Sequence, residues 1–252
     1  MVAALLAATA LLAPAAPAGA SAARPLVSLS ASPSRVALDG GGATRIEVTN
    51  VGTAVIAVAV SAEGLALDLR GRPSVARGRS ARSAAPWLSV RPRSLVLRPG
   101  RTAALAVAVT LPRRAEPGDH HALLLLTSRP LARGGVSVRM RLGVRVLVRA
   151  PGTVVRRLVV RAVRVRRSAG ARTLEVALEN RGNVTEELVR GRIALLLVRR
   201  GRTFARLRPA PRELLPRSRG VASAVYRGRA RGRVVVRVAI RNGASRSFHV
   251  RL

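Results

Sequence analysis

One group of potential metal ligands lies close together in the sequence, namely Glu116, Asp119, His120 and His121. Adjacent histidines on a strand point to opposite faces, so only one of the pair can join a given site. A metal site needs about three or four converging ligands, and His249, the third histidine, lies far along the chain. We therefore expect no metal and no cofactor. We interpret residues 117–119 as a turn that leads into a strand at 120–127.

No other combination of residues points to catalysis. The chain has no cysteine, which removes thiolate nucleophiles, disulfides and cysteine-bound metals. No G-x-S-x-G motif surrounds a serine, and the carboxylates are scattered. The glycines after Asp39 resemble a phosphate loop, but they lack the following Gly-Lys-Ser/Thr and precede a strand-like segment instead of a helix. We expect a protein that is not an enzyme.

Arginine dominates the charge, because all 46 basic residues are arginine and only 11 residues are acidic, which gives a formal net charge of +35. Such a surface attracts polyanions, for example nucleic acid, anionic lipid headgroups or anionic wall polymers. A surface that is merely solvated is the alternative, and both interpretations stay open. Aromatic side chains, on which sugars and unpaired bases usually stack, are few, and we expect the single tryptophan, Trp87, in the core.

The elements that carry this charge are predicted to be strands. Aliphatic residues occupy every second position from Val136 to Val148 and again from Val234 to Ile240, with arginines between them. Strict alternation places the aliphatic residues on one face of a strand and the guanidinium groups on the other. The predicted polyanion-binding residues are therefore the outward set Arg139, Arg141, Arg145, Arg149, Arg233, Arg237 and Arg241.

The chain divides into three segments. Residues 1–23 are uncharged and combine an apolar run with small residues, which is typical of a signal peptide. A faint repeat then relates the strand that ends at Asn50-Val51-Gly52 to the strand that ends at Asn180-Arg181-Gly182, where we expect both Asn and Gly to adopt positive φ. We expect an all-β fold of two immunoglobulin-like antiparallel β-sandwiches in tandem, at 24–150 and 151–252.

Four segments of the first half carry a family resemblance, namely 83–92 (SAAPWLSVRP), 95–100 (LVLRPG), 109–112 (VTLP) and 116–120 (EPGDH). They resemble the WxL-interacting proteins of the bacterial cell surface and in particular their peptidoglycan-binding immunoglobulin-like domain. The resemblance implies a secreted, non-enzymatic surface protein that attaches to the wall or to partner proteins. Members of that family end in a transmembrane helix, whereas this chain ends in a strand-like segment at 248–252.

These observations lead to one main functional hypothesis and two alternatives. The main hypothesis is an exported, non-enzymatic bacterial envelope protein, secreted or extracellular, that binds peptidoglycan, another anionic wall polymer or a surface protein partner. The first alternative is a periplasmic chaperone-like protein that lends a strand such as 136–149 to the exposed sheet edge of a subunit. The second is nonspecific nucleic-acid or polyanion binding, against which the expected export argues.

Overall fold

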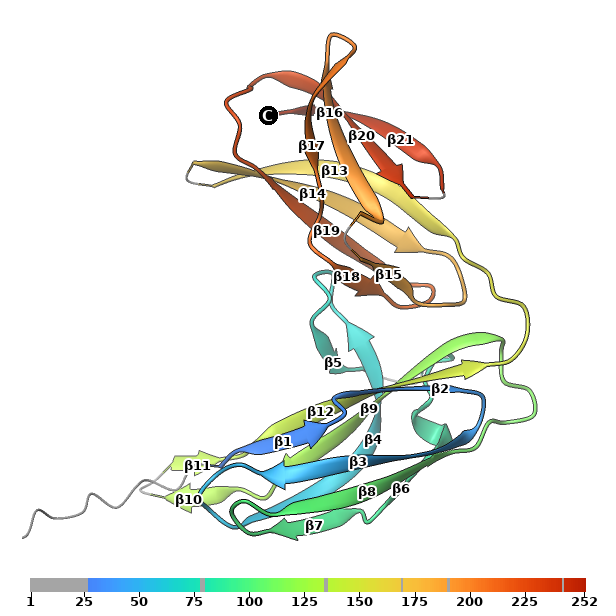
Figure 1. Cartoon of the computed structure of the whole chain (residues 1–252), viewed down its shortest axis with the longest axis vertical. Coiled ribbons are helices and arrows are strands. Elements are labelled where there is room, and N and C mark those ends of the chain that lie inside the picture. The colour runs from blue at the N-terminus through green and yellow to red at the C-terminus, as the bar shows by residue number, and fades with distance from the viewer. Residues whose placement is uncertain (1–26, 78–79, 134–135, 169, 190, 242) are drawn as a thin grey trace, which may run out of the picture.

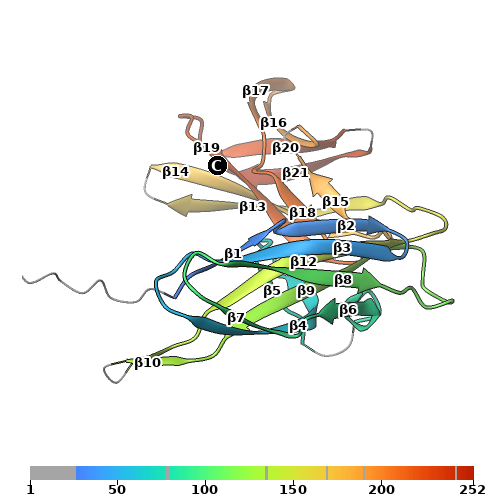
Figure 2. The same ribbon diagram turned by 60° about the horizontal axis from the view of Figure 1, so that its bottom comes forward.

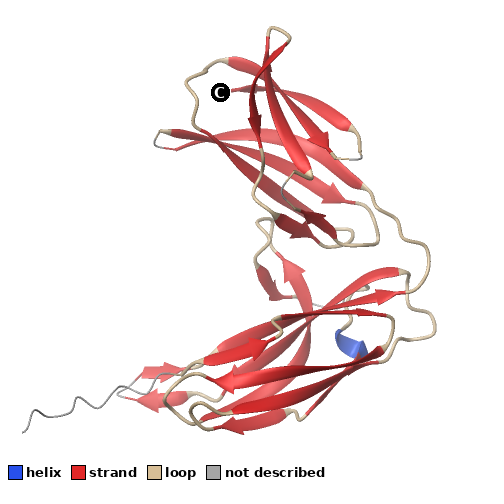
Figure 3. Cartoon of the chain, in the orientation of Figure 1, coloured by secondary structure: helices blue, strands red, loops and turns tan. Residues whose placement is uncertain are grey.

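The computed structural model describes residues 27–77, 80–133, 136–168, 170–189, 191–241 and 243–252 (Figure 1). Within these ranges the chain forms 21 strands and one 3₁₀ turn, η1 (Ala85–Trp87), with no α-helix (Figure 3). The expectation of an all-β fold is confirmed, and the strand pairs are antiparallel apart from one parallel pair, between residues 35–39 and 145–149. None of the described residues belongs to a helix long and apolar enough to span a bilayer. The expected signal peptide, residues 1–23, lies outside the described residues.

The N-terminal half contains two main sheets. The first has the order β1 (Leu29–Ser32), β3 (Gly42–Asn50), β8 (Thr102–Val109) and β6 (Leu88–Arg91). The second has the order β2 (Arg35–Asp39), β12 (Arg141–Ala150), β9 (Gly118–Ser128), β4 (Ile56–Leu67) and β5 (Pro73–Val75), and β7 (Ser94–Leu97) also pairs with β4. A short hairpin of β10 (Leu131–Arg133) and β11 (Val136–Val138) extends the β9–β12 connection.

Alternating residues of the two sheets form one hydrophobic cluster. Val144, Val146 and Val148 of β12 are buried, while the arginines between them point to the other face. They pack in the same cluster as Ile46 and Leu105 from the facing sheet. The predicted strand at 136–149 is therefore correct in its alternation but wrong in its continuity, because β11 ends at residue 138 and β12 begins at 141.

The C-terminal half has its own set of sheets and its own hydrophobic cluster. One sheet has the order β13 (Leu158–Ser168), β14 (Ala171–Asn180) and β19 (Arg219–Tyr226). A second has the order β17 (Arg202–Leu207), β16 (Ile193–Arg199), β20 (Arg233–Ile240) and β21 (Ser245–Arg251). A third pairs β15 (Glu186–Leu188) with β18 (Arg212–Leu214).

The two halves stack along the long axis of the molecule and are joined by residues 151–157 (Figure 1). The β15–β18 end of the C-terminal half lies over the sheet that contains β2, β12 and β9, and both views show this arrangement (Figures 1 and 2). Backbone hydrogen bonds cross between the halves, from the amide of Asp119 to the carbonyl of Asn183 at 2.8 Å and from the amide of Val221 to the carbonyl of Leu69 at 2.7 Å.

The sequence repeat marks equivalent turns in the two halves. Asn50 and Asn180 are fully buried, and each accepts a hydrogen bond from the amide of the glycine two residues later, at 3.0 and 2.9 Å. The amide nitrogen of Asn50 donates to two backbone carbonyls and that of Asn180 to three. The expected positive φ values are wrong, because none of these residues adopts one. The asparagines are needed for their side-chain hydrogen bonds.

Candidate functional site: an open strand edge beside a charged junction

The edge of β12 is only partly covered. β9 pairs with β12 over its whole length, from Arg141 to Ala150. On the other side, β2 pairs with residues 145–149 only, and the first hydrogen bond of that pairing runs from the amide of Arg145 to the carbonyl of Ser34 at 3.1 Å. Residues 141–144 therefore have no described strand on that side.

The backbone groups of this open segment point outward in a regular pattern. Met140 exchanges hydrogen bonds with Ser128 on the β9 side, whereas Arg145 bonds on the β2 side. Because successive residues of a strand direct their backbone groups to opposite sides, the N–H and C=O groups of Arg141 and Gly143 point toward the open side. They are the groups that an added strand would pair with.

The apolar side chains continue along the open segment beyond the closed part of the sheet. Met140 and Leu142 are half-buried against the N-terminal cluster. Val138, two residues before Met140, has 49% of its surface exposed. The row of apolar side chains that is buried at Val144 thus becomes more exposed toward Val138. It leaves an apolar row beside unpaired backbone groups.

Asp119 joins the two halves at the opposite end of β12. Its side chain is fully buried and accepts hydrogen bonds from Nε of Arg149 and from the backbone amide of Thr185, both at 2.7 Å. Burial alone would raise the pKa of this carboxyl, but the bonds from Arg149 and Thr185 outweigh it and lower the pKa. Asp119 is therefore a charged anchor that connects β9 and β12 to the loop before β15.

Glu213 forms the second charged contact between the halves. This residue of β18 pairs with Arg35 and with Arg145, one on each side of the β2–β12 contact. Arg35 also lies 3.2 Å from Glu187. Although burial opposes the ionised form, Arg145 and Arg35 hold the pKa of Glu213 below its usual value. The closed half of β12 is thus fixed by ion pairs as well as by β2.

The two histidines of the expected ligand group face opposite sides of β9, as predicted. His120 packs on the ring of Trp87 with centroids 4.3 Å apart, and its Nε2 lies 2.8 Å from the carbonyl oxygen of Glu116. Nε2 of His121 lies 2.8 Å from Oγ1 of Thr185. Burial lowers the pKa of His121 to about 4. No three His, Asp or Glu side chains converge on a metal position among the described residues.

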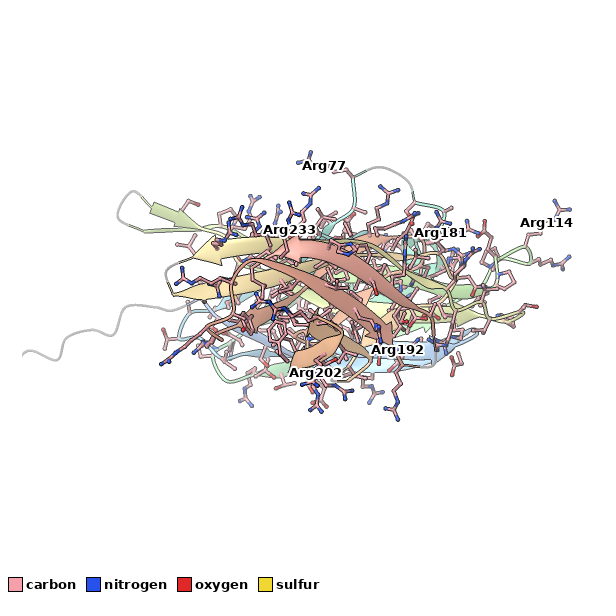
Figure 4. All side chains as sticks on the ribbon, turned by 90° about the horizontal axis from the view of Figure 1, so that it is seen from above. Arg77, Arg114, Arg181, Arg192, Arg202 and Arg233 are labelled. Atoms are coloured by element: carbon pink, nitrogen blue, oxygen red, sulfur yellow. The ribbon has the colours of Figure 1, made fainter. Side chains whose placement is uncertain are left out.

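The seven predicted polyanion-binding arginines fall into two separate groups. Arg145 and Arg149 are half-buried and occupied by Glu213 and Asp119 at the junction, so these two residues stabilise the molecule internally. The other five are exposed, with Arg139 and Arg141 at the start of β12 and Arg233, Arg237 and Arg241 along β20 or just after it. Their contact with a polyanion stays a prediction. In Figure 4 the side chains of Arg77 and Arg114 also extend away from the body of the molecule.

Three residues of the junction were missed by the sequence reasoning. The alternation pattern assigned no role to Glu213, which lies on the strand β18. Asp119 was interpreted as a turn residue, yet β9 begins one residue before it. No role was expected for Thr185 either. A signal did exist for Asp119 and Glu213, since an acid among so many arginines is itself rare in this sequence.

No family model matches the sequence, and no curated protein matches it. Among solved structures, a chain in the complex of the Salmonella enterica SafA pilin with the SafB chaperone has a TM-score of 0.47 and 14% identity, over 91% of this chain and 99% of that one. A chain in the Acinetobacter baumannii CsuC–CsuE chaperone–tip adhesion subunit complex has a TM-score of 0.46 and 14% identity, over 88% and 97%. The E. coli chaperone DraB has a TM-score of 0.43 and 15% identity, over 90% and 99%.

The expected relation to the WxL-interacting proteins is therefore wrong. No model of that family matches, and the solved structures named above are a chaperone or complexes of a chaperone with a pilin or tip adhesion subunit.

Proposed function

We propose that this chain is an exported, non-enzymatic, chaperone-like binding protein that lends the first half of β12 to the exposed sheet edge of a partner protein. In this proposal residues 24–150 and 151–252 are two immunoglobulin-like domains, each with the hydrophobic cluster described above. The single observation that carries the proposal is the unpaired edge of β12 at residues 141–144.

An added strand gains both affinity and specificity at such an edge. Main-chain hydrogen bonds to Arg141 and Gly143 would supply affinity, and alternate side chains would supply specificity. Val138, Met140 and Leu142 are the apolar residues that a partner would cover. The partner best suited to this edge is a β-rich protein with an unpaired strand of its own and an apolar groove beside it.

The exposed arginines would oppose pairing of the open edge with a second copy of the chain. Arg139 lies just before the unpaired segment, Arg141 is its first residue, and both are exposed. Charged side chains on an edge strand oppose edge-to-edge association, because pairing would bring like charges together. A partner with acidic residues beside its open strand would pair without that repulsion.

The test removes one outward N–H group from the open edge. In Arg141→Pro the proline has no N–H to donate, while the bonds of Met140 to Ser128 stay in place. Arg141→Gln is the matched control, because it removes the same charge and keeps the N–H. Each tagged variant is purified from envelope extracts of the native cells, and co-purifying proteins are quantified by mass spectrometry.

We expect a β-rich protein to co-purify with the wild type and with Arg141→Gln. The amount that co-purifies with Arg141→Pro should be lower by about tenfold or more, because this variant loses a main-chain hydrogen bond to the partner. Amide hydrogen exchange should also slow at residues 141 and 143 when that protein is bound. Equal recovery with both variants, or no change in exchange at these amides, would overturn the proposal.

A further inference from the structure

The end of the C-terminal half that points away from the junction contains a pocket lined by arginine. The pocket has a volume of about 590 Å³ and lies where the β13–β14 turn meets the loop between β19 and β20. Its charged lining residues are Arg167, Arg172, Arg227, Arg229 and Arg231. The remaining lining residues are Gly170, Ala171 and Gly228, which leave the guanidinium groups as the only ionisable groups of the lining.

Hydrogen bonds hold the walls of this pocket in place. Arg172 donates from one guanidinium nitrogen to the carbonyl oxygens of Gly228 and Ala230, at 3.2 and 3.1 Å. Leu252 and Gly232 exchange two backbone hydrogen bonds, at 2.9 and 3.2 Å, which fix the far end of the loop. A loop that is already held in place loses less conformational entropy when a ligand binds.

No side-chain carboxylate lies among the described residues that line this pocket. The sequence contains no Asp or Glu after Glu213, and Glu213 belongs to the junction at the opposite end. Along β14 the first acidic residue after the pocket is Glu175, which is occupied by Arg166 at 2.9 Å. Among the described ion pairs, none includes Arg227, Arg229 or Arg231.

A second hollow continues the same basic surface. It has a volume of about 450 Å³, and its lining includes Arg199, Arg200, Arg231 and Arg233. Arg231 lines both hollows and therefore connects them. Figure 4 looks down on this half of the molecule, with Arg202 and Arg233 labelled. We call the two hollows together the arginine tip.

We infer that the arginine tip is a binding site for phosphate oxyanions that are carried close together, as in a polyphosphate. Guanidinium groups stay charged at every physiological pH and present paired N–H donors that match the oxygens of phosphate. Several such cations around one hollow repel one another until an anion enters. A ligand with one negative charge would leave most of that repulsion in place, whereas neighbouring phosphates neutralise several arginines at once.

Two sources could present this chemistry, namely a free polyphosphate and the headgroups of an anionic lipid. The experiment therefore uses two probes with the purified mature chain. The first is inorganic tripolyphosphate, followed by isothermal titration calorimetry at low salt. The second is vesicles of phosphatidylglycerol and phosphatidylcholine, followed by sedimentation, with pure phosphatidylcholine vesicles as the uncharged reference.

The test variant is the triple substitution Arg227→Gln, Arg229→Gln and Arg231→Gln, whose side chains take no part in the hydrogen bonds and ion pairs described above. Arg172 is left unchanged because it holds the loop. The matched control, which removes the same charge from exposed loops of the N-terminal half, is Arg98→Gln, Arg101→Gln and Arg113→Gln. Circular dichroism and thermal melting confirm that each variant is folded.

We expect the triple substitution at the tip to weaken binding of tripolyphosphate by about tenfold or more, and the control to change it by less than about twofold. Binding of anionic vesicles but not of tripolyphosphate, lost only in the tip variant, would support the site and assign the phosphate to lipid headgroups. No binding of either probe, or equal losses in both triple variants, would overturn the inference. The strand-donation test at residue 141 is independent of every one of these outcomes.

Discussion

His121 makes the contact between the two halves sensitive to acid. Its ring is 4% exposed, and it is covered by Thr185 from the C-terminal half. The charged groups around it are Asp119 and Glu213, which favour the protonated ring, and Arg145 and Arg35, which oppose it. Burial is the largest of these effects and lowers the pKa to about 4, so the folded protein holds His121 in its neutral form.

The direction and size of the effect follow from that pKa. An unfolded chain protonates a histidine near pH 6.5, whereas the folded protein protonates His121 only near pH 4. Between these values the unfolded chain binds more protons, so stability falls as the pH falls from 6.5 and the loss is complete below about pH 4. A difference of about 2.5 units corresponds to about 3 kcal/mol of folding free energy.

The assay is urea unfolding at a series of pH values from 7 to 4.5, a window in which the carboxyls of Asp119 and Glu213 stay ionised because their pKa values are lowered. We expect His121→Gln, which keeps a side-chain group near Thr185, to remove most of the slope. A smaller dependence of stability on pH, in the same direction, should remain in this variant, because burial also lowers the pKa of His120. The exposed His249→Gln variant is the control. An unchanged slope in His121→Gln would refute the reasoning.

Three further substitutions test the packing of the molecule. Asp119→Asn should lower the free energy of unfolding by about 2–3 kcal/mol, because the partly exposed Arg149 loses its charge-assisted bond to the buried carboxylate. Urea unfolding measures the difference, with the exposed Glu47→Gln variant as the control. Asn180→Ala should destabilise the C-terminal half by about 3 kcal/mol, since three backbone carbonyls lose their donor, and faster amide exchange confined to that half would reveal it. Gly118→Ala should push the halves apart, because its Cβ would lie 2.1 Å from a carbonyl oxygen of the facing loop at a φ of +106°; small-angle scattering should detect a larger radius of gyration.

The strands could be predicted from the sequence because their alternation is strict. The aliphatic residues of β12 and β20 are buried and the arginines between them face the other way, as the pattern predicts. The repeat around Asn50 and Asn180 was also recognisable. The hydrogen bonds that make these asparagines necessary were not, because the carbonyls of Leu97 and Leu214 that they satisfy lie 47 and 34 residues away in the sequence.

The junction and the open edge could not be predicted, because both depend on which segments meet in space. The pair of Arg35 and Glu213 is separated by 178 residues, and nothing in the local pattern of either residue indicates the other. The open edge exists because β2, which runs parallel to β12, begins only opposite Arg145, and alternation says nothing about where a neighbouring strand begins. For the same reason Arg145 and Arg149 could be placed on the outer face but not in ion pairs.

The short partner of β12 has a mechanical consequence. One continuous strand carries the open segment at its first residues and, from Arg145 onward, the ion pair that ties it to Glu213. A protein bound at residues 141–144 would therefore contact the same strand that forms an ion pair with the C-terminal half, and binding there is expected to change how the two halves are arranged. A pair of spin labels, one on each half, would then report the arrival of the partner as a change in distance, without any label on the partner itself.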